Sequence, residues 1–314
     1  MGSPEGLRPF GGVRGRALPS LPQKEETMQS PTVAAVHDLS CVGRCALTVV
    51  IPVLAAMGIQ PCPLPTAVLS THTGGYRDIA MRDLTGFMEE CVGHWRSLGL
   101  RFDAVYSGYL ATVTQAETVL RLIEWQEESD DPLIVVDPVM GDDGKLYSSM
   151  PSDMPAEMCR LCAKADLITP NMTEVALLTG TPYDLTPRTP AQIEAMFSAL
   201  DAKCAVVTSV PFPNGRWANV LKRRGERGYW QAAFEPVPVH YPGTGDLFTS
   251  VMTGALVLGA SPQSAMARAT RFVRSVVARS EQVGGEVRSG VQLESGLAEL
   301  MRGEEAPVEL IDHP

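Results

Sequence analysis

The chain has 314 residues, of which 26 are Lys or Arg and 36 are Asp or Glu, so its formal net charge is −10 at pH 7. An acidic chain is poorly suited to polyanions, so neither a nucleic-acid surface nor a broad surface for anionic lipid is expected. Hydrophobic residues make up 45% and charged residues 20%, values typical of a globular protein that exclude a wholly disordered or fibrous chain.

The apolar and cysteine patterns narrow the class further. The longest strongly apolar stretch, Leu47–Met57, is too short to span a bilayer and contains Pro52, so no membrane helix is predicted. Seven scattered cysteines favour reduced thiols and a cytoplasmic location. Cys159 and Cys162 have C-x-x-C spacing without a second pair, which favours two thiols one helical turn apart over a metal or redox site.

Taken in chain order, the sequence begins with a predicted flexible tail, residues 1–31, which contains five glycines and five prolines. From Thr32 onward, short β-branched runs alternate with amphipathic helical patterns, which predicts βα units around a largely parallel sheet. The clearest strands are Thr32–Val36, Ala104–Tyr106, Leu133–Val136, Asp166–Thr169 and Ala205–Thr208. The clearest helices are Arg44–Met57, Ala116–Glu128, Ala191–Leu200 and Pro262–Arg279. Residues 32–290 show no linker and are predicted as one domain, followed by a C-terminal helix and tail over 291–314.

A Gly-Thr-Gly-Asp segment, Gly243–Asp246, carries the strongest chemical signal. It precedes a helical pattern, so its backbone N–H groups are expected at a helix N-terminus, where the helix dipole favours an anion. Asp in a first helical turn is also a common cap, and the segment alone leaves that alternative open. Phosphorylation of an alcohol needs both features together, a carboxylate to accept the hydroxyl proton and N–H groups to hold the phosphoryl charge.

Acidic residues also follow the predicted strand Leu133–Val136, where Asp137 comes directly after the strand and Asp142 soon after it. Ligands bind at the C-terminal ends of parallel strands in open α/β sheets, so these carboxylates are candidates for orienting Mg²⁺ or its waters. The alternative is a solvated turn rich in Asp and Gly.

A third polar group follows the strand Asp166–Thr169, where Pro170 ends the strand and Asn171 is placed to cap the next helix. Asn171 and Glu174 are three residues apart, so both can face one point at the helix start. A capping box explains this spacing. The functional alternative is that Glu174 holds a metal-bound water beside a triphosphate.

These motifs, in this order, resemble the ribokinase-like superfamily, and the N-terminal half resembles its pyridoxal kinase branch, the vitamin B6 kinases. The resemblance covers about residues 32–282 and includes a Cys62–Ala67 run that is similar to the group of pyridoxamine kinases. The segments that carry it are His37–Arg44, Ser70–Tyr76, Ser107–Tyr109, Asp137–Asp142, Thr169–Glu174, Val206–Ser209 and Gly243–Asp246.

The resemblance implies an α/β fold, the ribokinase-like three-layer α/β/α sandwich with a mostly parallel central sheet. It also implies transfer of the ATP γ-phosphoryl group to the 5′-hydroxymethyl oxygen of pyridoxal, pyridoxamine or pyridoxine. The implied cofactors are ATP and Mg²⁺, with a monovalent cation left open, and the implied assembly is a homodimer. Hydroxymethylpyrimidine kinase and a non-catalytic vitamin- or nucleotide-binding protein are the alternatives.

Individual roles follow from the resemblance position by position. Asp246 is the general base, which also contacts the substrate, and the N–H groups of Gly243, Thr244 and Gly245 form the anion hole. The acids implied near the phosphate groups and Mg²⁺ are Asp137, Asp142 and Glu174. The polar contacts implied for the nucleotide are Asn171 and Thr208. The vitamin ring is contacted by Asp38, His72, Thr73 and Tyr109.

Two departures from the family pattern affect the substrate side. Asp38 stands where many pyridoxal kinases have Ser, and a carboxylate there could pair with a protonated ring nitrogen or with the amine of pyridoxamine. Arg44 stands where the better-known members have Asn. The alternatives that stay open here are that His72 bonds the backbone of its turn and that His37 packs at the end of its strand.

Overall fold

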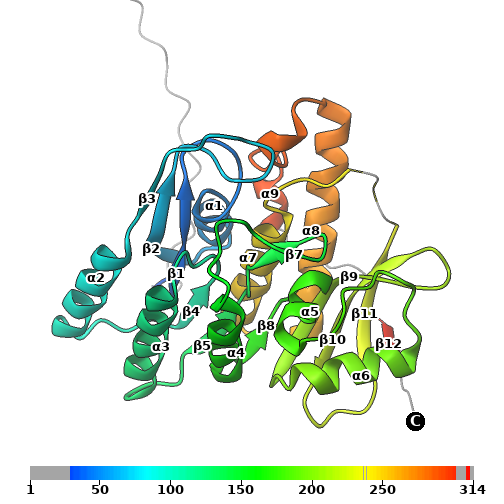
Figure 1. The fold of residues 1–314 in the computed structure, drawn as a ribbon, viewed down its shortest axis with the longest axis horizontal. Helices are drawn as coiled ribbons and strands as arrows, with labels where there is room; N and C mark the ends of the chain where they lie inside the picture. Colours follow the sequence, from blue (N-terminus) through cyan, green and yellow to red (C-terminus); the bar gives the residue numbers. More distant parts are fainter. Residues whose placement is uncertain (1–28, 236, 238, 302–308, 312–314) are drawn as a thin grey trace, which may run out of the picture.

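The computed structural model describes residues 29–235, 237, 239–301 and 309–311 (Figure 1). The predicted tail lies outside the described residues apart from its last positions, 29–31, and its flexibility stays a prediction. From Thr32, strands and helices alternate over much of the chain as the sequence pattern predicts, whereas three strands follow one another within 204–234. None of the described helices is long and apolar enough to cross a bilayer.

A ten-stranded sheet runs through the described part of the chain, in the order β12-β11-β10-β9-β8-β5-β4-β1-β2-β3. Its centre, from β9 to β2, is parallel, whereas the pairings at both edges are antiparallel. The strands are β1 (Thr32–Ser40), β2 (Gln60–Leu69), β3 (Met81–Asp83), β4 (Ala104–Ser107), β5 (Leu133–Val136), β8 (Leu167–Ile168), β9 (Cys204–Pro211), β10 (Trp217–Arg223), β11 (Tyr229–Phe234) and β12 (Glu309–Ile311). A separate hairpin joins β6 (Gly141–Asp142) to β7 (Lys145–Leu146).

Helices cover both faces of this sheet and bury two hydrophobic cores (Figure 1). One face carries α2 (Thr85–Ser97), α3 (Val113–Glu127), α4 (Met154–Lys164), α5 (Met172–Thr179) and α6 (Pro190–Leu200). The other carries α1 (Leu47–Ala56), α7 (Thr244–Val257), α8 (Pro262–Val283) and the short α9 (Leu297–Leu300). Strand β1 shows why both faces are apolar, since Ala34 and Val36 enter the first core and Val33 and Ala35 the second. The predicted three-layer sandwich is confirmed.

Several element ends differ from the sequence prediction, and the start of α1 differs for a local reason. Helix α1 begins at Leu47 instead of Arg44, because Ala46 has φ 55° and ψ −135°, which is not helical. Strand β8 covers only Leu167–Ile168 of the predicted Asp166–Thr169. Cys159 and Cys162 lie on α4, as their spacing predicts.

The C-terminal segment contains a strand in addition to the predicted helix and tail. Its residues 309–311 form strand β12, which pairs with β11 and was not predicted. The preceding 3₁₀ turn, Val287–Ser289, lies against two loops of the site: the Arg44 N–H donates to the Ser289 carbonyl (3.2 Å), and His72 Nε2 lies 2.7 Å from the Arg288 carbonyl. This segment therefore holds the two loops against each other.

Candidate active site

A cavity of about 670 Å³ lies along the C-terminal ends of the parallel strands. A cavity of this size suits a small-molecule ligand. Every residue that the sequence predicts for the site lines this one cavity, namely Asp38, His72, Thr73, Tyr109, Asp137, Asp142, Asn171, Glu174, Thr208, Gly243, Thr244, Gly245 and Asp246. Their individual roles stay predictions, but the fold brings all of them together.

The N-terminus of α7 faces this cavity. Gly243 is the N-cap with φ 81°, a left-handed conformation that favours glycine, and its added Cβ would lie 2.1 Å from the Arg44 carbonyl oxygen. The first N–H groups of a helix have no partner within the helix. Those of Thr244 and Gly245 are therefore available to an anion, and the helix dipole adds positive potential.

The Asp246 carboxylate, in the first turn of α7, is buried and held at both oxygens. Oδ1 lies 2.9 Å from His37 Nε2, and Oδ2 accepts from the Ala46 N–H at 2.7 Å. Burial alone would raise the pKa of Asp246, but the charge and hydrogen bond of His37 hold this pKa below its ordinary value. Asp246 is thus ionised at neutral pH, and each oxygen keeps a lone pair for a substrate hydroxyl.

Two neighbours of Asp246 were not predicted as site residues, His37 and Cys45, and both line the cavity. Burial, followed by the negative charge of Asp246, raises the pKa of Cys45 well above its ordinary value. The thiol is therefore neutral and a poor nucleophile. His37 opens the segment His37–Arg44, but the sequence does not reveal its pairing with Asp246, because the two residues are 209 positions apart.

Asp137, at the end of β5, is a buried carboxyl group whose Oδ2 accepts from the Thr249 hydroxyl on α7 at 3.0 Å. Burial, followed by the charge of Asp246, raises the pKa of Asp137 to about 7. A carboxylate in this state is stabilised by a nearby cation.

Asn171 and Glu174 form the capping box of α5, as their spacing allows. The Asn171 side chain accepts from the Glu174 N–H at 2.9 Å and donates to the Gly141 carbonyl at 3.1 Å. The Glu174 carboxylate accepts from the N–H groups of Asn171 (2.8 Å) and Met140 (3.2 Å). Burial and the charge of Asp137 raise the pKa of Glu174 well above its ordinary value. The capping box that the spacing predicts is therefore present. The Glu174 carboxyl group is at the same time a buried acid on the cavity wall.

Asp142 completes the acidic wall, and its Oδ2 lies 3.1 Å from His240 Nε2. Among the residues that the structure describes, no three His, Cys, Asp or Glu side chains are grouped closely enough to hold a metal ion. Mg²⁺ beside a nucleotide is usually bound by one or two carboxylates, water and phosphates. Asp137 and Glu174 are both buried acids with raised pKa values, and the charge of Asp137 contributes to the shift of Glu174, so the pair fits a cation held jointly with phosphate.

The wall formed by β1, β2 and β4 carries the predicted ring contacts. Asp38 Oδ1 lies 3.0 Å from His37 Nδ1, and Asp38 Oδ2 accepts from the Ser40 hydroxyl at 3.2 Å. His72 bonds the backbone through both ring nitrogens: Nδ1 accepts from the Gly74 N–H (3.1 Å), so Nε2 donates to the Arg288 carbonyl (2.7 Å). Its ring nitrogens are thereby engaged, which gives His72 the backbone-bonding role that the sequence left open. Thr73 is exposed, and Tyr109 is nearly buried.

The opposite wall, from β9 to β11 and α8, is largely apolar and carries residues that the sequence left unassigned. Trp217, Phe234 and Val273 line it beside Thr208. The buried Asn219 accepts from the Ser209 N–H at 3.0 Å and donates to the Thr270 hydroxyl at 2.9 Å, which fixes the bend at Ser209, where φ is 56°. A wall that combines apolar side chains with a few polar groups is typical of a small-molecule site.

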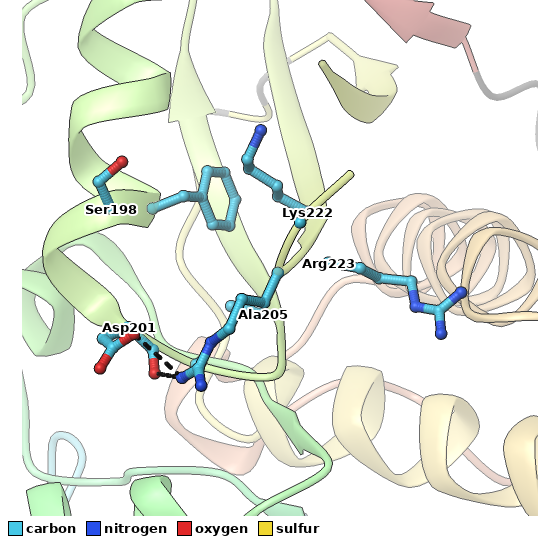
Figure 2. A pocket seen from close by; sticks show the side chains of 9 residues that line it. Ser198, Asp201, Ala205, Lys222 and Arg223 are labelled. Carbon is cyan, nitrogen blue, oxygen red and sulfur yellow. Dashed lines mark hydrogen bonds and ion pairs between the residues drawn. The ribbon is translucent and has the colours of Figure 1, made fainter. Parts of the chain in front are cut away.

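A second, smaller pocket of about 140 Å³ lies between the end of α6 and β10, and Figure 2 shows Lys222 and Arg223 among the side chains that line it. The three cations of this basic cluster are each paired with a carboxylate: Lys222 with Glu194 (2.7 Å), Arg223 with Glu226 (3.1 Å) and Arg224 with Asp201 (3.0 Å). Lys222 and Arg223 lie at the end of β10, and these ion pairs leave the cluster little positive charge to attract an anion.

Comparison with known proteins agrees with the class that this fold and cavity define, an α/β kinase of small alcohols. Residues 51–290 match the family described as phosphomethylpyrimidine kinase. The match spans well over half of the chain, and the chain therefore belongs to this family.

Its relatives identify the branch. A pyridoxine/pyridoxal/pyridoxamine kinase from Bordetella avium is 29% identical over 258 residues, which cover 78% of this chain and 84% of the relative. A candidate phosphomethylpyrimidine kinase from Bacteroides thetaiotaomicron, solved with pyridoxal, is 40% identical with a TM-score of 0.84 and covers 90% of this chain and 100% of its own. Pyridoxal kinase from Lactobacillus plantarum is 34% identical with a TM-score of 0.79 and covers 88% and 98%. The predicted pyridoxal kinase branch of the ribokinase-like superfamily is confirmed.

Proposed function

We propose that this chain is a vitamin B6 kinase that transfers the γ-phosphoryl group of ATP to the 5′-hydroxymethyl oxygen of pyridoxal, pyridoxamine or pyridoxine. The observation that carries the proposal is the N-terminus of α7, which places free N–H groups and the ionised Asp246 carboxylate in one cavity. The relatives named above support the choice of substrate, because they include kinases of these vitamers and a structure with pyridoxal.

In the proposed reaction, the vitamer hydroxyl donates a hydrogen bond to Asp246 and attacks the γ-phosphorus of ATP. The hydroxyl proton passes to Asp246, the new O–P bond forms, and the electron pair of the broken bond leaves with ADP. The N–H groups of Thr244 and Gly245 stabilise the charge on the transferred group, because they are fixed in direction before the reaction begins. The nucleotide would be contacted by Thr208 on the opposite wall and by Asn171 at the start of α5, both of which line the cavity.

Mg²⁺, when bound, would neutralise charge on the phosphate oxygens. The residues that would hold it, directly or through water, are Asp137, Glu174 and Asp142, which all line the cavity. The substitution Asp137→Asn separates this role from a structural one. The Thr249 hydroxyl can still donate to the amide oxygen of the new side chain, and the buried negative charge disappears.

We expect Asp137→Asn to melt at the same temperature as wild type or higher at pH 8, because burial raises the pKa of Asp137 and so makes its ionised form unfavourable. The same variant should need at least about tenfold more Mg²⁺ for half-maximal turnover, since a lost carboxylate contact weakens cation binding by about 1.4 kcal/mol or more. Thermal unfolding and Mg²⁺ titration of the rate measure the two effects. An unchanged Mg²⁺ dependence would remove Asp137 from the cation site.

The direct test is ADP release with Mg·ATP and one alcohol at a time: pyridoxal, pyridoxamine, pyridoxine or hydroxymethylpyrimidine. We expect turnover of at least one B6 vitamer and its loss in the Asp246→Asn variant. Turnover of the pyrimidine alone would move the chain to pyrimidine phosphorylation, which the family description suggests as the second candidate. Vitamer binding in a thermal-shift assay without ADP release would instead favour a binding protein.

Vitamer preference depends on Asp38, whose carboxylate lines the cavity while bound to His37 and Ser40. A negative group at this wall favours a vitamer with a cationic amine or ring nitrogen.

The assembly as a homodimer, the cytoplasmic location and a monovalent cation stay predictions of the sequence. Light scattering after size-exclusion chromatography tests the first of these.

A further inference from the structure

His37 lies between two carboxylates in the cavity wall. Its Nδ1 is 3.0 Å from Asp38 Oδ1, and its Nε2 is 2.9 Å from Asp246 Oδ1. The side chain is 3% exposed, so water does not screen either contact. The pairing of β1 with β2 shifts register between His37 and Leu39, and both His37 and Asp38 line the cavity although they are consecutive strand residues.

The surroundings are shaped to hold this ring. A Cβ at Gly108 would lie 2.1 Å from His37 Cδ2, so any larger residue there would displace the imidazole. Tyr106 presents its ring edge-on at a centroid distance of 6.5 Å. The ring is therefore fixed by packing from β4 as well as by its two acidic partners.

Two carboxylates require two N–H donors, and only the imidazolium form of His supplies both. The Asp38 N–H also lies 3.0 Å from Nδ1, an arrangement that would suit a neutral ring. The ionic partners decide between these forms. Burial lowers the pKa of His37, but the charges and hydrogen bonds of Asp246 and Asp38 outweigh it and raise this pKa to about 10. The ring is charged at neutral pH.

The groups around Asp246 come from several elements. His37 and Asp38 lie on β1, Cys45 on the loop before α1, Tyr106 on β4, and Asp137 after β5, with Tyr147 also acting on the site from after β7. Of these groups, His37 alone carries positive charge, and the acidic ones disfavour a second carboxylate. The charge that keeps Asp246 ionised therefore comes from His37.

We propose that His37 is a positioning residue for phosphoryl transfer, a clamp that bridges Asp246 and Asp38 and fixes the Asp246 carboxylate. This inference rests on the proposed function. When the hydroxyl proton passes to Asp246, His37 keeps both of its protons, and its charge stays balanced by Asp38. Asp38 then acts on the reaction through His37 in addition to any contact with the vitamer.

The first test is the replacement His37→Gln, whose amide keeps a donor for Asp246 but carries no charge. We expect kcat to fall by about 10- to 100-fold with the vitamer KM within about threefold, because the carboxylate is less well oriented. The acidic limb of the kcat profile should move to higher pH by about one to three pH units, the usual effect of removing an adjacent opposite charge. A role in packing alone would not move that limb.

The matched control is His94→Gln, an exposed histidine on α2 outside the cavity, which should retain wild-type kcat and pH profile. Circular dichroism checks that each variant folds. The clamp would be overturned if the His37→Gln protein folds, keeps the wild-type kcat and shows no movement of the acidic limb. Vitamer turnover by the wild type would then leave the kinase assignment in place. Lack of vitamer turnover by wild type would overturn both.

A second measurement reports on the clamp without turnover. In ¹⁵N-histidine-labelled full-length protein, the signals that disappear in His37→Gln identify the ring. We expect both of its nitrogens to show imidazolium shifts from pH 6 to pH 9, and to titrate at lower pH in Asp246→Asn. Titration of the wild-type ring near the ordinary histidine pKa of about 6.5 would overturn the clamp.

Discussion

The Asp246→Asn variant is expected to lose about 10²- to 10⁴-fold in kcat, the usual contribution of a general base, with vitamer and ATP KM values changed only a few fold. The amide has about the same size as the carboxylate, so the cavity keeps its shape. It cannot take the hydroxyl proton at neutral pH. The loss should therefore appear in the chemical step and not in binding, which single-turnover kinetics with a quench-flow readout measures.

The same substitution also has a structural cost that must be measured. Asp246 accepts from two donors, His37 Nε2 and the Ala46 N–H, and the amide of Asn has one oxygen for both. Ala46 has φ 55°, so the hydrogen bond that its N–H donates to Asp246 holds a strained residue at the start of α1. One unpaired buried donor costs about 1–3 kcal/mol, and a lowered melting temperature is expected.

A control variant distinguishes the loss of one negative charge from the loss of the Asp246 carboxylate in the cavity. Asp153→Asn changes the net charge by the same amount at an exposed position before α4, outside the cavity, and should behave as wild type. If Asp246→Asn binds pyridoxal, stays folded at the assay temperature and retains more than a tenth of the wild-type kcat, Asp246 is not the base. The α7 N-terminus would then act through its N–H groups alone.

The sequence predicts the fold well because its signals are local. The run Thr32–Val36 is apolar at every position except its first residue, and a strand buried on both faces requires that pattern. The Asn171 and Glu174 spacing predicts a capping box, and the structure contains one. Strand β12 has no such signal, because its pairing with β11 joins segments that are far apart in the chain.

The site was predictable to the extent that its residues follow strand ends or open a helix. Asp137 and Gly243–Asp246 meet this condition, and the order of the strands brings them into one cavity. The partners of these residues were not predictable. From the sequence alone, His37 is equally consistent with a residue that only packs at a strand end, and its contact with Asp246 is seen only in the structure. Asn219 lies in a segment where the sequence offers no motif. Pairings between distant residues carry the electrostatics of the site, and a single sequence does not record them.

Gly243 and Gly245 should respond in opposite ways to the same added methyl group. At Gly243, alanine would need φ 81° and would place its Cβ 2.1 Å from the Arg44 carbonyl oxygen, a backbone atom that moves only if the loop before α1 moves. Positive φ and overpacking together should cost about 2–4 kcal/mol of folding free energy. Gly243→Ala is therefore expected to unfold at a clearly lower denaturant concentration.

At Gly245, the added Cβ would meet no atom within 4 Å, and the residue lies in the first turn of α7 on the cavity surface. Alanine favours helix over glycine by up to about 1 kcal/mol, so Gly245→Ala should fold at least as stably as wild type. We nevertheless expect its kcat/KM for ATP to fall at least about tenfold, because the methyl group takes space that the transferred phosphoryl group needs beside the N–H groups. Urea unfolding and steady-state kinetics on both variants give the comparison. A stable Gly245→Ala protein with wild-type kcat/KM would mean that the phosphoryl group lies elsewhere, since no folding defect could account for that result.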